Sequence, residues 1–351
     1  MAEKAQARFN GSALVSMAAF VVIVAGLRTA QGIVVPFLVA VFLAVICLPP
    51  LHWLQHKGLP TWLALVVMTV IVAVIGLLIV GIIGTSVNQL REELPQYEKR
   101  VGELQDQFVD QLKAWNIDAG FKLSRDDFDA QRALSLFGGV LSAVGSVLGN
   151  ALIIVFTLFF MMLEAADFPA KLRAIGPDSD ALGARVAKIQ DNVRRYISLK
   201  TRISFVNGVL IAAWLWLLGV DFPLLWGLLA FLLNFIPNIG SFIAAVPAVV
   251  LAFLQLNLAT AAYAAAGYVA LDFVIGNVIE PRLMGRGLGL SSLVVFLSLV
   301  FWGWVLGPVG MLFSVPLTMI VKIVLDSSDD LRWIAILLSS EAPAKRAKAA
   351  G

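Results

Sequence analysis

The sequence predicts an all-α, polytopic membrane protein. Of its 351 residues, 60% are apolar and only 14% are charged, whereas soluble domains average about 45–50% apolar and about 25% charged residues. The apolar residues also form long runs, and a helix of about 20 such residues matches the hydrocarbon core of a bilayer. Backbone polar groups in lipid must be satisfied internally, and these runs lack the alternation of a barrel strand. We therefore expect membrane helices.

The N-terminal part of the chain predicts a helical hairpin followed by a further span. Two runs, Ser12–Leu27 and Ile33–Leu48, each have 16 residues, and one helix across both would be too long for a single span. We expect a bend near Arg28–Gly32 and a helix end at Pro49-Pro50, because proline interrupts helices. The run Thr61–Gly84 has 24 residues and predicts the third span.

The polar region 85–137 predicts a helical segment outside the membrane. Apolar side chains within Val87–Trp115 recur every three or four residues, which places them on one face of a helix. A capping box at Ser124 predicts a second, short helix. The apolar run Gly138–Leu163 then predicts another span.

A second polar region, 164–202, predicts a basic amphipathic helix. Apolar residues from Leu182 to Ile197 follow helical spacing, and arginine and lysine occupy the opposite face, which is typical of helices on a membrane surface. Further apolar runs predict a C-terminal core, and they are Ile203–Gly219, Leu224–Leu256, Leu258–Ile279, Leu290–Leu306 and Val309–Leu325. In all, we expect about seven to eight membrane segments.

The run Leu224–Leu256 is interrupted in its middle by Ile236-Pro237-Asn238-Ile239-Gly240. Proline and glycine together predict a broken or re-entrant helix pair here, although a simple helix–loop–helix at the membrane face stays open. Transporters bind substrates at such breaks, because the interrupted backbone exposes polar groups near the midplane. The substrate pathway that we expect contains Asn234, Pro237, Asn238, Gly240, Ser241 and Asn277.

Ionisable residues in and after the run Leu258–Ile279 predict a coupling or gating site. Such residues are costly at membrane depth and usually face a partner or a cavity. Asp272 lies 14 residues after the start of this run and seven before its end, about 10 Å from the nearer helix end, so we expect it to face the protein interior. Glu280 can pair with Arg282 or Arg286 and shape a gate, or such a pair can simply anchor the helix end.

Known enzyme and cofactor motifs are absent from the sequence. It contains no Gly-x4-Gly-Lys-Ser/Thr loop, no Gly-x-Ser-x-Gly elbow and no His-Glu-x-x-His pair. The single cysteine, Cys47, permits no intrachain disulfide and no cysteine-based metal site. We expect no enzymatic activity, no cofactor, no metal site and, because the net charge is only +3, no nucleic-acid partner.

Loop charge predicts the orientation, because cytoplasmic loops are enriched in Lys and Arg. Region 164–202 has eight such residues in 39 positions, and region 85–137 has seven in 53. We therefore place both termini, 164–202 and 280–289 in the cytoplasm, and 85–137 outside. The predicted parts are an N-terminal hairpin with the third span (1–84), an extramembrane segment (85–137), a span (138–163), a cytoplasmic amphipathic linker (164–202), a transport core (203–326) and a tail (327–351).

Three stretches resemble the autoinducer-2 exporter (AI-2E) family. They are Asn234-Phe-Ile-Pro-Asn-Ile-Gly-Ser241, Gly276-Asn-Val-Ile-Glu-Pro-Arg-Leu-Met-Gly-Arg-Gly-Leu-Gly-Leu290 and the stretch from Val294 to Pro316. Weaker similarity extends over nearly the whole chain. The resemblance implies an inner-membrane homo-oligomer, expected to be a pentamer, that exports the quorum-sensing signal autoinducer-2. Some members are sodium/proton antiporters, so the resemblance leaves both the substrate and a coupling to protons or sodium open.

Three functions remain open from the sequence. The first is a secondary exporter of a small, neutral, hydroxyl-rich signal, because amides and broken backbone suit such a ligand. The second is a sodium (cation)/proton antiporter that uses Asp272 or Glu280 as the exchanging carboxylate. The third is a membrane scaffold without transport, with 85–137 as its interaction segment.

Overall fold

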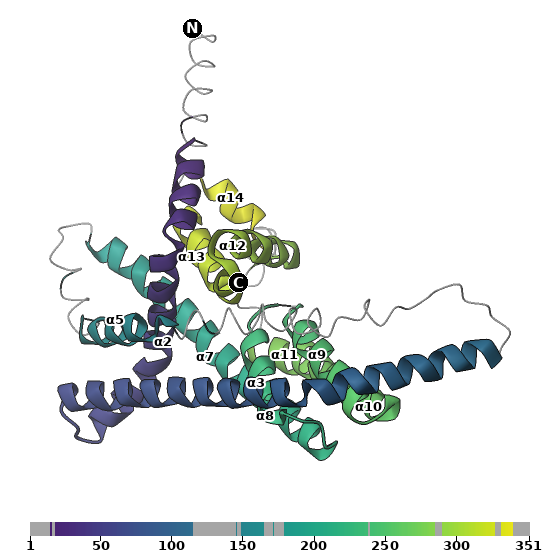
Figure 1. Cartoon of the computed structure of the whole chain (residues 1–351). Helices are drawn as coiled ribbons and strands as arrows, with labels where there is room; N and C mark the ends of the chain where they lie inside the picture. Colours follow the sequence, from purple (N-terminus) through teal and green to yellow (C-terminus); the bar gives the residue numbers. More distant parts are fainter. Residues whose placement is uncertain are drawn as a thin grey trace, which may run out of the picture. The chain divides into compact units, whose positions relative to one another are not determined.

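The structure, a computed structural model, describes residues 15, 18–114, 145, 149–164, 171, 179–237, 239–284, 290–326 and 331–339. These residues form helices joined by turns, with one isolated β-bridge between Leu290 and Ser339 and no longer strand among them. The chain divides into two compact units. Unit 1 contains Met1–Val66, Leu152–Arg194 and Gly289–Gly351, and unit 2 contains Val67–Ala151 and Arg195–Leu288. The helices can be followed by colour and label in Figure 1.

Four of the described helices are long and apolar enough to cross a membrane. They are Gln31–His56, Thr61–Glu93, Leu258–Leu283 and Ser292–Leu312. Shorter apolar helices accompany them, at Ala18–Thr29, Ala151–Glu164 (α5), Pro223–Leu233 and Gly240–Gln255. The all-α, multi-pass membrane architecture is therefore confirmed, whereas the number of membrane segments stays a prediction.

In unit 1, helix α2 (Gln31–His56) differs from the sequence prediction at both ends. The predicted bend consists of a single irregular residue, Ala30, with φ −84° and ψ 10°. The helix Ala18–Thr29 runs on into α2 without reversing its direction (Figure 1). The predicted end at Pro49-Pro50 is wrong, because α2 continues through both prolines to His56. Membrane helices tolerate proline when neighbouring groups satisfy the freed carbonyls.

The C-terminal helices of unit 1 are α12 (Ser292–Leu312), α13 (Ser314–Asp326) and α14 (Arg332–Leu337). Gly307 interrupts α12 with φ 68° and ψ −156°, and Pro308 follows. Positive φ is unfavourable for residues with a side chain, which explains glycine here. The break falls between the predicted runs Leu290–Leu306 and Val309–Leu325. Trp302 Nε1 then donates a hydrogen bond to Thr318 Oγ1 (3.0 Å), which joins α12 to α13.

Two long helices contribute most of their length to unit 2. Helix α3 (Thr61–Ala114) has 54 residues and continues from the third predicted span into the polar region without a break. Helix α7 (Ser179–Leu217) has 39 residues and joins the predicted amphipathic linker to the run that follows it. The predicted second helix at Ser124 lies outside the described residues.

The predicted break in Leu224–Leu256 is confirmed and produces a helical hairpin in unit 2. Its arms are α8 (Pro223–Leu233) and α9 (Gly240–Gln255), with 11 and 16 residues. They measure about 17 and about 24 Å, and each is shorter than the roughly 30 Å hydrocarbon core. Gly240 lies so close to the Leu233 carbonyl that a side chain there would overlap it.

Both ends of this hairpin lie at the same end of unit 2. The Asp221 N–H, just before α8, donates to Gln255 Oε1 (2.9 Å), and Gln255 Nε2, at the end of α9, donates to the Gly219 carbonyl (3.1 Å). The turn between the arms is therefore the far tip of the hairpin. The two arms therefore form an antiparallel helical hairpin, and whether it is re-entrant stays a prediction.

Tyr97 of α3 joins the same end of unit 2. Its hydroxyl donates to Glu93 Oε2 (2.6 Å) and lies 3.1 Å from Asp221 Oδ2. A phenol carries one hydrogen, so the two carboxylates share this donor. Burial, with the neighbouring acidic groups, raises the pKa of Tyr97. Burial is also the main cause of the raised pKa of Asp221, which the hydrogen bond from Tyr97 partly offsets.

The last element of unit 2 changes its helical winding before a proline. Helix α10 (Leu258–Val274) passes into the π-helix η1 (Ile275–Ile279) and then into α11 (Glu280–Met284). Pro281 lacks an N–H and its ring crowds the carbonyl four residues earlier, and a wider turn relieves that clash. The proline thus accounts for the π-helix at this position.

Candidate functional site

One face of α7 carries a stripe of buried polar residues, which we call the α7 polar face. It consists of Tyr196, Lys200, Ser204 and Asn207, and none of them is more than 4% exposed. Their intervals of four, four and three residues place them on the same side of the helix. Polar side chains in a membrane protein usually turn toward partners or a wet interior, because lipid cannot satisfy them. The α7 polar face therefore points into unit 2.

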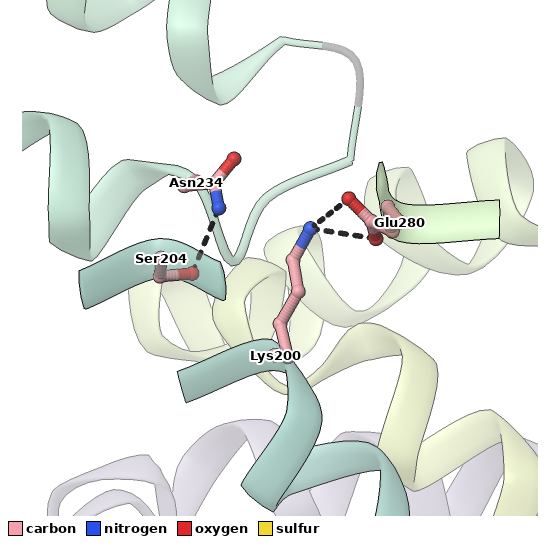
Figure 2. Close-up of polar contacts among 4 residues, drawn as sticks. All are labelled: Lys200, Ser204, Asn234 and Glu280. Carbon is pink, nitrogen blue, oxygen red and sulfur yellow. Dashed lines mark hydrogen bonds and ion pairs between the residues drawn. The ribbon is translucent and has the colours of Figure 1, made fainter. Parts of the chain in front are cut away.

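Lys200 forms a buried ion pair with Glu280, the first residue of α11. Its Nζ lies 2.8 Å from Oε1 and 2.9 Å from Oε2 of the carboxylate (Figure 2). The Lys200 side chain is 5% exposed and that of Glu280 is 26% exposed. The predicted partners of Glu280 were different: Arg282 is exposed on α11, and Arg286 lies outside the described residues. Glu280 thus binds a lysine that is distant in sequence.

A second contact attaches the hairpin tip to the α7 polar face. Asn234, at the end of α8, donates from Nδ2 to Ser204 Oγ at 2.8 Å, and both residues are buried (Figure 2). The backbones of α7 and α8 can approach closely because glycines face each other, as in many membrane helix pairs. A Cβ added to Gly208 would lie 2.6 Å from the Gly227 carbonyl oxygen. These glycines therefore allow the tip to reach Ser204.

Asp272 connects α10 to both of these elements. Its carboxylate lies within the electrostatic influence of three side chains, which are Ser241 at the start of α9 and both Asn207 and Lys200 of the α7 polar face. The carboxylate therefore faces the interior of unit 2 and not lipid alone. Three helices converge on this position, each through a polar side chain.

The family model for AI-2E family transporters matches residues 17–329 of this sequence. The chain belongs to the AI-2E family. It is 39% identical to the AI-2 transport protein TqsA of Escherichia coli K12, over 94% of this chain and 96% of that protein. It is 37% identical to a putative transport protein of Haemophilus influenzae, over 93% and 95% of the two chains. It is 33% identical to the putative transport protein YhhT of E. coli K12, over 95% of each. A membrane transporter follows from this membership.

Only some of the site residues predicted from the sequence form polar contacts in this family member. Asn234, Ser241, Asp272 and Glu280 all take part in the polar contacts of unit 2. Asn277 is exposed on η1, and Asn238 lies outside the described residues. Pro237 and Gly240 shape the hairpin tip and offer no side-chain polar group.

Sequence reasoning missed the α7 polar face. Lys200 was assigned to a surface helix, and Ser204 and Asn207 to an ordinary span. The spacing of these residues along one helical face was the signal that could have identified them. Among the described residues, no group of three or more His, Cys, Asp or Glu side chains could hold a metal ion.

Proposed function

We propose that this AI-2E family member is a secondary transporter that exports a small signalling molecule, autoinducer-2, across the bacterial inner membrane. The observation that carries the proposal is the convergence of the α7 polar face, the hairpin tip and Asp272 inside unit 2. Hydroxyl and amide groups in an apolar protein can replace the hydration of a neutral polar solute. The identity to TqsA, which is named for AI-2 transport, supports this choice of substrate.

We propose that transport is coupled to protons through Asp272. Asp272 and Glu280 contribute two carboxylates, and Lys200 contributes one ammonium group, which is bound to Glu280. Neutrality in a low-dielectric interior then requires one more positive charge, because an uncompensated charge is costly there. Asp272 can acquire that charge as a proton, which makes it the first candidate for coupling, with Glu280 second.

The same charge count supports a second candidate function, a sodium (cation)/proton antiporter. In this function Asp272 exchanges a proton for a cation, and no organic solute is carried. The two functions share a site but differ in what crosses the membrane. A transport measurement therefore separates them directly.

The contacts of unit 2 also support the proposed topology, in which both termini are cytoplasmic. Lys200 and Glu280 belong to regions 164–202 and 280–289, which loop charge assigns to the same side. Tyr97 and Asp221 meet at the hairpin ends, which this topology places outside. Regions 85–137, as an extramembrane segment, and 203–326, as the transport core, complete the proposal. The assembly that we propose is a homo-oligomer, specifically a pentamer.

Labelled autoinducer-2 and everted membrane vesicles provide the test. Vesicles containing the protein should accumulate the label faster than empty-vector vesicles, and a proton gradient should increase the rate. Asp272→Asn should abolish the effect of the gradient while the purified oligomer keeps its size. Asp326→Asn, which changes a half-exposed carboxylate in unit 1, is the matched control and should behave as the wild type.

Each alternative result has a definite meaning. Sodium-driven proton movement without accumulation of autoinducer-2 would replace the exporter with the antiporter. Full gradient dependence in Asp272→Asn would show that Asp272 is only a structural hydrogen-bonding residue. Absence of both activities in functional vesicles would refute transport of either kind.

A further inference from the structure

Three polar atoms in unit 2 are buried without a hydrogen-bond partner among the described residues. They are Thr201 Oγ1, Asn207 Oδ1 and Tyr268 Oη. Asn207 and Tyr268 are each only 2% exposed. Buried polar atoms are nearly always paired, because an unpaired one loses its hydration without compensation. Unpaired buried atoms on α7 and α10 of a transporter therefore point to a ligand that pairs with them.

Two of these atoms lie beside Asp272. The Asn207 side chain acts on the Asp272 carboxylate, and its carbonyl oxygen is buried without a partner among the described residues. Tyr268 precedes Asp272 by one helical turn on α10, and the charge of Asp272 acts on its phenol. Asn207 and Tyr268 are therefore both electrostatically linked to Asp272.

The chemistry of these groups defines what they can bind. The Asn207 carbonyl accepts hydrogen bonds, and so does the Asp272 carboxylate when it is ionised, whereas the Tyr268 hydroxyl can both donate and accept. Acceptors predominate, so a ligand must bring hydrogen-bond donors. Neutral hydroxyl groups satisfy this condition and leave the charge balance of Asp272, Glu280 and Lys200 unchanged.

We propose that Asn207, Tyr268 and Asp272 form a binding subsite for a small neutral molecule with two adjacent hydroxyl groups. One hydroxyl donates to Asn207 Oδ1 and the other donates to the Asp272 carboxylate, while Tyr268 donates to an oxygen of the ligand. The subsite lies in the proposed transport pathway and in that respect rests on the proposed function. It adds Asn207 and Tyr268 as residues that recognise the ligand.

The test measures binding without transport and without autoinducer-2. The full-length protein in lipid nanodiscs is titrated with 1,4-anhydroerythritol, a five-membered ring with adjacent hydroxyls, and with 3-hydroxytetrahydrofuran, which lacks one of them. The readout is the thermal unfolding midpoint at each concentration. The diol should raise the midpoint at lower concentration than the mono-alcohol.

Tyr268→Phe is the decisive variant, because it removes only the unpaired hydroxyl. It should leave the midpoint without ligand unchanged or higher, and it should weaken diol binding about twofold to tenfold, as expected for one hydrogen bond. Asn207→Leu, which removes the carbonyl acceptor, should also weaken diol binding. Tyr263→Phe on the same helix is the control, because Tyr263 is 61% exposed, and it should bind the diol as the wild type does.

Four outcomes would overturn the proposal. The two alcohols could act equally, or Tyr268→Phe could bind the diol as tightly as the wild type. Tyr268→Phe could lower the midpoint without ligand and leave diol binding unchanged, which would indicate a structural water. Sodium chloride could give the Tyr268-dependent stabilisation in place of the diol, which would indicate a cation site. A failure of autoinducer-2 transport alone would refute the proposed function and leave diol binding in the nanodisc measurement as a separate result.

Discussion

Removing either partner of the Lys200–Glu280 ion pair should destabilise the protein, and the two losses should differ in size. Glu280→Gln leaves an ammonium group that is 5% exposed without its counter-charge, which costs about 3–5 kcal/mol in comparable buried pairs. Lys200→Met leaves Glu280, which is 26% exposed and still reaches solvent. The cost should therefore be smaller, about 1–3 kcal/mol. The double variant removes both charges of the ion pair and should be more stable than Glu280→Gln alone.

Equilibrium unfolding in mixed micelles with increasing sodium dodecyl sulfate, followed by circular dichroism, would measure these differences. Lys57→Met is the matched control, because Lys57 is exposed and its Nζ only lies over the Trp53 ring at 4.0 Å. The control should shift the unfolding free energy by no more than about 1 kcal/mol, because it loses only an exposed cation–π contact. A Glu280→Gln protein with wild-type stability would refute the reasoning, as would a double variant that is less stable than both single variants.

Three further predictions concern the hairpin and its ends. Asn234→Leu should lose the hydrogen bond that holds the tip, at about 0.5–1.5 kcal/mol, and slow transport in vesicles; wild-type unfolding and rates would contradict this. Gly240→Ala should reduce the yield of folded oligomer in size-exclusion chromatography, because the added methyl group overlaps the Leu233 carbonyl of α8. Gly276→Ala is the control, because a methyl group there meets no atom within 4 Å and should leave the yield unchanged. Equal yields of the two variants would argue against a close approach at Gly240. Burial raises the pKa of Asp221 above 3.8, so the folded state binds its proton more tightly and this contact should lose stability as pH rises through the raised pKa. Hydrogen exchange of the amides of 218–222, corrected for intrinsic rates, should accelerate over that pH range. The hydrogen bond from Tyr97 lowers the pKa of Asp221, so Tyr97→Phe should raise this pKa and move the range to higher pH. An unmoved range would refute the shared hydroxyl.

The helix break at the hairpin tip could be predicted from the sequence because it depends on only a few neighbouring residues. Long apolar runs require helices in lipid, and Pro237 with Gly240 interrupts one run at a defined place. The same local reasoning failed at Pro49-Pro50, since proline fits the helical φ, and a helix can continue where its surroundings accommodate the missing N–H and the proline ring. Whether its helix continues depends on what surrounds the freed carbonyls.

The partners inside unit 2 depended on tertiary packing. Lys200 and Glu280 are 80 residues apart, and Ser204 and Asn234 are 30 apart. Hydropathy showed which residues are polar, but it could not show which polar faces meet. Which polar faces meet depends on how closely α7 and α8 approach each other. Gly208 of α7 permits a close approach because it lies against the backbone of Gly227 in α8. The sequence by itself therefore determined the membrane helices, the break and the family, because these follow from local patterns, whereas the packing of distant helices decided which charges and amides form one site.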